Sequence, residues 1–270
     1  FYMIKYKKFL ITGAASGLGK SLAKSLNNLN KELILLDKNF DGLKSLEQEL
    51  GTNKNLKIIN FDLSNKDLIN DLFEKHLKED TDIDCLINCA AYEAAGFFDD
   101  IPIEEMLKNI DTNAISPILL TKKVLPFLVK NNGAVVNMIS TMSTVGVPGR
   151  MPYCISKSAL KSFSDVLRCE LKYQNVQVLT VYPEVMSTPF WENVLYFGRI
   201  KNAMFNDPRK KNDPKKIAKG ILKALEKNKF FYWQYSFTNL FSIFHFIFTN
   251  LGDRIVDIIC NIKNSNIKPK

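Results

Sequence analysis

Tyr153 and Lys157 lie four residues apart and form the pair with the clearest chemical potential in this sequence. An apolar helical pattern continues beyond them, and this spacing places both side chains on one helix face. An ammonium group beside a phenol lowers the phenol pKa from about 10 and lets it exchange a proton near neutral pH. Ser140 ends the apolar run 134–139, where a strand-end hydroxyl can hydrogen-bond a substrate oxygen. The alternative is an exposed helix pair and an ordinary loop serine, because short motifs are common by chance.

A glycine-rich turn near the start of the chain indicates a partner for such chemistry. The apolar run Lys8–Thr12 leads into Gly13, Gly17 and Gly19, and an amphipathic helix follows. Glycine is needed where the backbone turns tightly or approaches a ligand. A glycine-rich turn between a strand and a helix directs free N–H groups and the helix dipole at a pyrophosphate. The turn therefore predicts a dinucleotide site.

Asp37 ends the next apolar run, 32–37, about twenty residues past the glycine turn. A carboxylate at this position would accept hydrogen bonds from the adenosine ribose and repel a 2′-phosphate. The residue therefore favours NAD, with NADP as the alternative, and the neighbouring Lys38 weakens that preference. A turn or helix-capping role would explain Asp37 equally well.

Helical and strand patterns alternate through most of the chain, which predicts an α/β fold, a doubly wound parallel sheet of Rossmann type. We expect one domain over residues 1–229, and an aromatic-rich C-terminal extension over 230–270. The pattern from Ile103 to Val129 reads as one long helix with kinks at Pro117 and Pro126.

Composition restricts the remaining functions. The chain has 270 residues, 46% of them apolar, and a net charge of +9. Eleven Lys and Arg against three acidic residues lie between Arg199 and Lys229; such a stretch suits phosphates, nucleic acid or an anionic membrane, or is a solvated face. Five scattered cysteines and two histidines favour reduced thiols and no metal site. The start shows no signal peptide, so we expect a cytoplasmic protein.

The spaced motifs together resemble the short-chain dehydrogenase/reductase family from Lys8 to about Lys229. The family motif T-G-x-x-x-G-x-G matches Thr12–Gly19, its acidic residue after the third strand matches Asp62, and its N-N-A-G matches Asn88–Ala91. Its mid-helix Asn matches Asn113 and its catalytic Ser matches Ser140. Its Y-x-x-x-K matches Tyr153–Lys157, and its P-G-x-x-x-T matches Pro183–Thr188. Three positions depart from the motifs: Cys89 replaces the second Asn, and Ala91 and Glu184 replace glycines.

The resemblance implies an NAD(P)-dependent oxidoreductase acting on a secondary alcohol or a ketone/aldehyde. Tyr153 would be the general base or acid, Lys157 would hold ribose hydroxyls, Ser140 would fix the substrate oxygen, and Asn113 would hold a water toward Lys157. The implied cofactor-binding residues are Thr12, Gly13, Ser16, Gly17, Leu18, Gly19, Asp37, Asp62, Leu63, Asn88, Ala90, Tyr153, Lys157, Pro183, Val185 and Thr188. A non-catalytic dinucleotide-binding sensor or scaffold at a membrane surface is the alternative.

Two further segments bear on substrate and partners. The resemblance implies a lid over the substrate at about 184–212, where apolar residues suggest a bulky or lipophilic substrate or, equally, core packing. Residues 230–248 hold ten aromatics. They could pack on the domain, form a subunit contact, or enter a membrane surface beside the basic stretch. We therefore expect a homodimer or homotetramer, peripheral membrane contact as an alternative, and no nucleic-acid partner.

Overall fold

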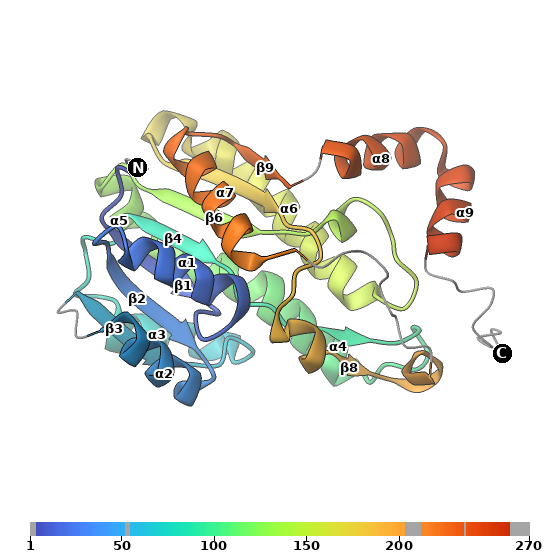
Figure 1. Ribbon diagram of the computed structural model, residues 1–270, viewed down its shortest axis with the longest axis horizontal. Helices are drawn as coiled ribbons and strands as arrows, with labels where there is room; N and C mark the ends of the chain where they lie inside the picture. The colour runs from blue at the N-terminus through green and yellow to red at the C-terminus, as the bar shows by residue number, and fades with distance from the viewer. Residues whose placement is uncertain (1–3, 52–54, 203–211, 235, 260–270) are drawn as a thin grey trace.

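The computed structural model describes residues 4–51, 55–202, 212–234 and 236–259 (Figure 1). Seven parallel strands form one sheet in the order β3-β2-β1-β4-β6-β7-β9. In that order their bounds are Leu56–Asn60, Glu32–Asp37, Lys8–Thr12, Cys85–Asn88, Ala134–Met138, Gln177–Tyr182 and Phe231–Trp233. The predicted doubly wound parallel sheet is confirmed.

Helices cover both faces of this sheet, as Figure 1 shows. On one face lie α1 (Gly17–Asn27), α2 (Phe40–Leu50) and α7 (Pro214–Glu226); on the other lie α3 (Ile69–His76), α5 (Ser116–Lys130) and α6 (Met151–Glu170). The central strands β1, β4, β6 and β7 are buried on both faces, which explains their nearly unbroken apolar runs.

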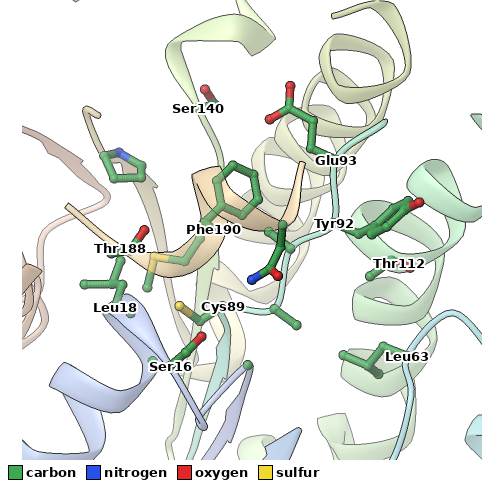
Figure 2. A pocket seen from close by; sticks show the side chains of 18 of the residues that line it. Ser16, Leu18, Leu63, Cys89, Tyr92, Glu93, Thr112, Ser140, Thr188 and Phe190 are labelled. Carbon is green, nitrogen blue, oxygen red and sulfur yellow. The ribbon is translucent and has the colours of Figure 1, made fainter. Parts of the chain in front are cut away.

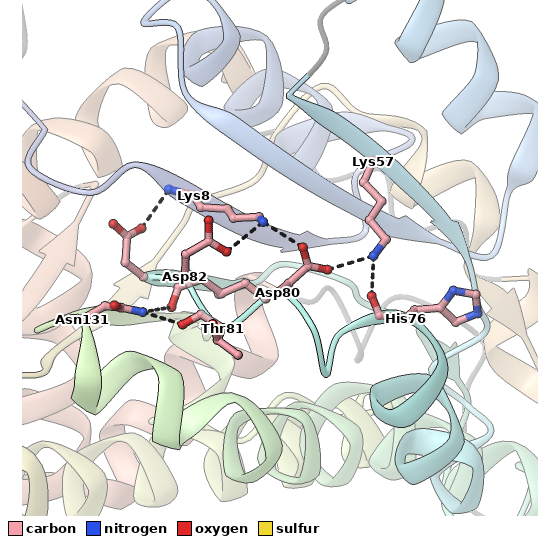
Figure 3. Close-up of polar contacts among 9 residues, drawn as sticks. Lys8, Lys57, His76, Asp80, Thr81, Asp82 and Asn131 are labelled. Atoms are coloured by element: carbon pink, nitrogen blue, oxygen red, sulfur yellow. Dashed lines mark hydrogen bonds and ion pairs between the residues drawn. The ribbon is translucent and has the colours of Figure 1, made fainter.

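Charged side chains hold the sheet at the amino ends of the strands (Figure 3). Lys8 at the start of β1 bonds Asp80 at 2.7 Å and Asp82 at 2.9 Å. Lys57 in β3 bonds the other oxygen of Asp80 at 2.8 Å and the carbonyl of His76. This network lies at the opposite end of the strands from the glycine turn, so it contributes to the scaffold and not to a site.

The predicted single helix from Ile103 to Val129 is wrong in its middle. The chain forms α4 (Ile103–Ile110), a π-helical turn η2 (Asp111–Ile115) and then α5. The N–H of Ser116 reaches back five residues, to the carbonyl of Asp111. Pro117 has no N–H for the carbonyl four residues earlier, so the α-helical ladder cannot continue there. Pro126 lies inside α5 and does not end it.

The last strand of the sheet comes from the predicted C-terminal extension. β9 pairs in parallel with β7, and the Trp233 ring stacks on Tyr182 with centroids 3.7 Å apart. The predicted domain boundary at residue 229 thus falls just before a strand of the same sheet.

Two helices follow β9 and stand apart from the body of the molecule, α8 (Ser236–Ile247) and α9 (Thr249–Ile259) (Figure 1). A hydrogen bond of 2.7 Å joins the hydroxyls of Ser242 in α8 and Thr144 in the loop after β6. Large apolar side chains of both helices are exposed: Leu240, Ile243, Phe246, Ile247, Phe248, Leu251 and Ile258. These seven residues form what we call the apolar C-terminal face.

Candidate active site

The predicted catalytic side chains Ser140, Tyr153 and Lys157 meet where β6 ends and α6 begins. Ser140 is the second residue after β6, while Tyr153 and Lys157 lie in the first two turns of α6. The Lys157 ammonium lies 5.5 Å from the centroid of the Tyr153 ring and donates to the Met138 carbonyl at 2.9 Å. All three side chains line one cavity of about 570 Å³. The structure therefore brings together the residues that spacing selected.

Burial dominates the titration of Tyr153. Removal from water raises the pKa of the Tyr153 phenol above its ordinary 10, and the nearby Glu93 carboxylate raises it further. A hydrogen bond with Ser140 acts in the opposite direction and is the weaker effect. The predicted lowering of this pKa by Lys157 is therefore wrong for the protein alone, and Tyr153 holds its proton at neutral pH.

Lys157 shows the complementary shift. Its side chain is 2% exposed, and burial lowers the pKa of its ammonium from 10.5 to about 8. The Glu93 carboxylate opposes this shift. At neutral pH the lysine is still mostly cationic, but a small rise in pH would neutralise it.

Asn113 belongs to the π-helical turn and is fully buried. Its side-chain amide accepts from the N–H of Tyr92 at 2.8 Å and donates to the carbonyl of Tyr92, also at 2.8 Å. The same amide nitrogen contacts Asn109 and Ser156. Asn113 thus fixes the chain that leaves β4 against α6. No described contact joins its side chain to Lys157, so its role in holding a water stays a prediction.

The glycine turn packs backbone against backbone. Thr12 accepts through its hydroxyl from the N–H groups of Cys89 and Ala90, at 3.0 and 3.1 Å. Gly13 has φ +67°, and a Cβ there would meet the Cα of Ala90 at 2.7 Å. A Cβ on Gly19 would lie 2.1 Å from the Gly13 carbonyl oxygen. Only glycine permits this approach of α1 to the two strand ends.

The amino end of α1 faces the cavity. Ser16 is its N-cap residue but makes no side-chain capping bond. Gly17 has φ +53°, and a Cβ there would lie 3.2 Å from Thr188, which enters from the far side. Further predicted residues line the same space: Gly13, Gly19, Leu18, Pro183 and Val185. A helix amino end without a side-chain cap, preceded by a turn of glycines and small residues at the cavity, fits a dinucleotide pyrophosphate.

Asp37 ends β2 at the rim of this cavity. One carboxylate oxygen accepts from the N–H of Ala15 at 3.0 Å, and the other accepts from the N–H of Asn39 at 2.9 Å. Asp37 thus has the turn-capping role that the sequence allowed and also lines the cavity, while its contact with a ribose stays a prediction. A carboxylate has further acceptor positions, so a ribose hydroxyl could still bind.

The predicted adenine and ribose contacts divide into two groups. Asp62 and Leu63 line the cavity. Asn88, predicted to face the cofactor, does not line it: its side chain is buried and donates to Asn137 at 2.8 Å. Asn137 in turn donates to Ser164 in α6, also at 2.8 Å. That prediction is wrong for the side chain, because its amide nitrogen donates to Asn137 in the neighbouring strand and to Thr121 in α5 and so points away from the cavity. The Thr12 hydroxyl likewise binds backbone N–H groups, those of Cys89 and Ala90.

An aromatic segment covers the cavity beside Tyr153. The centroids of Phe190 and Tyr153 lie 6.2 Å apart, and Figure 2 shows Phe190 across the cavity from Cys89 and Ser16. Trp191 packs edge-on against Phe190 and donates to a backbone carbonyl of the same segment. The predicted lid at 184–212 lies within the described residues except for 203–211.

A buried ion pair beside the site is absent from the sequence-based prediction. Glu93 follows β4 and lines the cavity, and Arg150 caps the start of α6. The side chains are 1% and 3% exposed and form an ion pair. Fifty-seven residues separate them, and no local pattern connects such positions. The cavity also takes up Tyr92, Thr112 and Met142, which sequence reasoning missed.

Comparison with known families agrees with this geometry. A family model described as short chain dehydrogenase matches residues 7–196. The chain belongs to this family. Among curated short-chain dehydrogenases, it is 30% identical over 229 residues to dehydrogenase/reductase SDR family member 7B of Xenopus tropicalis, covering 82% of this chain and 74% of the relative. It is 26% identical over 249 residues to 3-ketodihydrosphingosine reductase of Dictyostelium discoideum, covering 85% and 75%.

Solved structures of short-chain dehydrogenases share the fold. One from Streptomyces avermitilis has a TM-score of 0.80 at 21% identity and covers 96% of both chains. A 4-hydroxyisoleucine dehydrogenase complexed with NADH has a TM-score of 0.70 at 26% identity, covering 81% of this chain and 90% of that chain. This short-chain dehydrogenase is accordingly an oxidoreductase that uses a nicotinamide cofactor.

The residues that the structure describes contain no helix with the length and apolar character needed to cross a bilayer. They also contain no convergent group of three or more His, Cys, Asp or Glu side chains.

Proposed function

We propose that this enzyme interconverts a secondary alcohol and a ketone or aldehyde at a site formed by Ser140, Tyr153, Lys157 and Asn113, with Asn113 holding a water toward Lys157. One observation carries the proposal: a protonated tyrosine, its serine partner and a buried lysine share one cavity with the glycine turn. A sensor or scaffold without catalysis would have no need to bury a lysine beside a tyrosine, because that burial costs stability.

The residues divide the work as follows. NAD(P), when bound, supplies or accepts the hydride. Tyr153 gives its proton to the carbonyl oxygen in reduction and takes it back in oxidation. Ser140 holds that oxygen by a hydrogen bond, and Lys157 holds ribose hydroxyls and stabilises negative charge on the phenol. Because burial raises the pKa of Tyr153 in the protein alone, the phenol holds the proton that reduction requires.

We infer a lipophilic substrate from apolar residues of the cavity lining that lie outside the glycine turn. Its lining residues are Ile139, Met142, Phe190, Trp191 and Leu195. Apolar walls with a few polar groups are typical of sites for bulky organic ligands. The relative named 3-ketodihydrosphingosine reductase supports the same substrate class.

A substrate screen tests the proposal. Ketones and alcohols of increasing chain length are offered with NAD(H) and with NADP(H), and nicotinamide absorbance reports turnover. We expect kcat/KM to rise with apolar chain length. Cofactor binding without turnover of any carbonyl or alcohol would instead favour the non-catalytic sensor or scaffold.

For the cofactor, we propose that NAD(H) is preferred, because Asp37 would repel a 2′-phosphate. Asp37→Ala should then narrow the difference in dissociation constant between NADH and NADPH, measured by fluorescence titration. Tighter binding of NADPH by the unmodified protein would contradict this and give the dominant role to Lys38, which also lines the cavity.

For partners and location, we propose a cytoplasmic homodimer or homotetramer whose residues 1–229 form the catalytic domain, and no nucleic-acid partner. The apolar C-terminal face is the observation that calls for a partner, because exposed apolar patches mark contacts with proteins or membranes. A peripheral membrane contact through residues 230–270 is the alternative.

A further inference from the structure

The buried pair of Glu93 and Arg150 has no part in the proton and hydride transfer proposed above, yet both charges act on Tyr153. In Figure 2 the Glu93 carboxylate lies on the same side of the cavity as Ser140. Its charge acts on both Tyr153 and Lys157. Burying two charges costs more folding free energy than burying apolar residues of equal volume. A functional role would explain why the pair is there.

The pair is held firmly from three sides. The Arg150 guanidinium hydrogen-bonds Tyr196 and lies 5.8 Å from the ring centroids of both Trp191 and Tyr196. The Glu93 carbonyl accepts from the N–H of Leu195 at 3.1 Å. Next to Glu93, β5 (Ala94–Ala95) pairs with β8 (Leu195–Tyr196). The carboxylate therefore keeps its place when a substrate enters.

The Glu93 carboxylate has acceptor positions that lack a hydrogen-bond donor once a substrate fills the cavity. Arg150 contacts Oε1, and among the described residues no other side chain bonds the carboxylate. A carboxylate offers about four acceptor positions. Water can serve the remaining positions in the open cavity, but a bulky substrate displaces it. A substrate without a donor would leave a buried acceptor unpaired, which is unfavourable.

We propose that Glu93 is a specificity-determining residue that accepts a hydrogen bond from a hydroxyl or amino group next to the reacting carbon of the substrate. The proposal rests on the proposed function and narrows it: the substrate is a ketone with an apolar chain on one side and a donor-bearing carbon on the other. Arg150 acts as a positioning residue, because it holds Glu93 and does not itself line the cavity.

Three ketones of equal chain length test this proposal: a methyl ketone, its hydroxymethyl analogue and its methoxymethyl analogue. The unmodified enzyme should favour the hydroxymethyl ketone over both others by about ten- to a hundredfold in kcat/KM. Glu93→Gln should narrow the gap between the hydroxymethyl and methoxymethyl ketones at least fivefold, about 1 kcal/mol, because the amide nitrogen presents a donor. Equal kcat/KM values in the unmodified enzyme would overturn the proposal.

A double variant guards against a folding defect. Glu93→Leu with Arg150→Met replaces the ion pair by apolar side chains, a change that proteins often tolerate. We expect it to abolish the hydroxymethyl preference, whereas Glu184→Gln, another carboxylate lining the cavity, should keep it. A preference that survives the double variant would contradict the role of Glu93.

Binding is measured separately, by quenching of tryptophan fluorescence with each ketone. Tighter binding of the hydroxymethyl ketone that depends on Glu93, but without turnover, would support this inference and overturn the proposed function. Turnover of all three ketones without discrimination would overturn this inference and leave the proposed function standing.

Discussion

Lys157 and Tyr153 are close enough to influence each other, yet burial determines how each one titrates in the protein alone. The phenol pKa is raised and the ammonium pKa is lowered to about 8. Both shifts favour the uncharged form of the group, as expected when water is removed. Residue spacing could predict the contact but not the burial, because burial depends on elements far away in the sequence.

The Lys157 shift predicts a stability that depends on pH. The folded-state pKa of about 8 lies below the ordinary 10.5, so between these values the unfolded chain binds more protons than the native protein. Stability therefore rises with pH in this window, and the cost of burying the charge is fully present below about pH 8. Relative to Lys157→Met, the unmodified protein should gain about 2–3 kcal/mol of unfolding free energy from pH 8 to 10. Denaturant titrations at several pH values measure it; a difference independent of pH would contradict the shift.

Other single residues could be predicted only where their position depends on nearby parts of the sequence. Ser140, Tyr153 and Lys157 were identifiable because their positions follow from one strand and one helix. The side chain of Asn88 was misplaced, since its partner Asn137 lies on another strand. Glu93 was missed because its role depends on Arg150 and on the covering segment.

At the scale of elements, the strands were the most predictable part of the chain. Buried parallel strands read as apolar runs, and the predicted runs 8–12, 32–37 and 134–139 agree with β1, β2 and β6 to within one residue. The helix from 103 to 129 was predicted as one helix with kinks at its prolines, because a π-helical turn does not change the hydrophobic periodicity. Its position at Asn113, beside the site, matches the frequent placement of such turns at functional sites.

The packing of α1 on β1 gives a prediction at this scale. Gly19→Ala should force α1 away from the Gly13 carbonyl, since a Cβ there would lie 2.1 Å from that oxygen. We expect a loss of about 1–3 kcal/mol in unfolding free energy and at least tenfold weaker cofactor binding. Gly146→Ala is the matched control, because a Cβ at that glycine meets nothing within 4 Å. Equal cofactor affinity in both variants would argue against the glycine turn as the pyrophosphate site.

At the scale of the whole molecule, the sheet gathers the site at one end of its strands and leaves α8 and α9 projecting from the body (Figure 1). Composition alone predicted an aromatic extension but not that its first residues complete the sheet as β9. Residues 231–233 form a strand because they pair with β7. A strand this short leaves no recognisable pattern in its own sequence.

The projecting helices allow a direct test of the partner. Deletion of residues 236–270 removes α8 and α9 but keeps β9, so the domain should still fold. If the apolar C-terminal face is a subunit contact, the deletion should convert an oligomer to monomers in analytical ultracentrifugation, and neither form should sediment with vesicles. Salt-sensitive sedimentation with anionic vesicles that the deletion abolishes would instead assign the face to a membrane surface.

In the mechanism that we propose, Tyr153 transfers the proton that accompanies hydride transfer. Tyr153→Phe keeps the ring and removes only the hydroxyl, so the fold and the cofactor affinity should be unchanged. Turnover of the best ketone found in the screen, followed by nicotinamide absorbance at saturating cofactor, should fall by about two to four orders of magnitude. Turnover within a few fold of the unmodified enzyme, with cofactor bound normally, would contradict the mechanism.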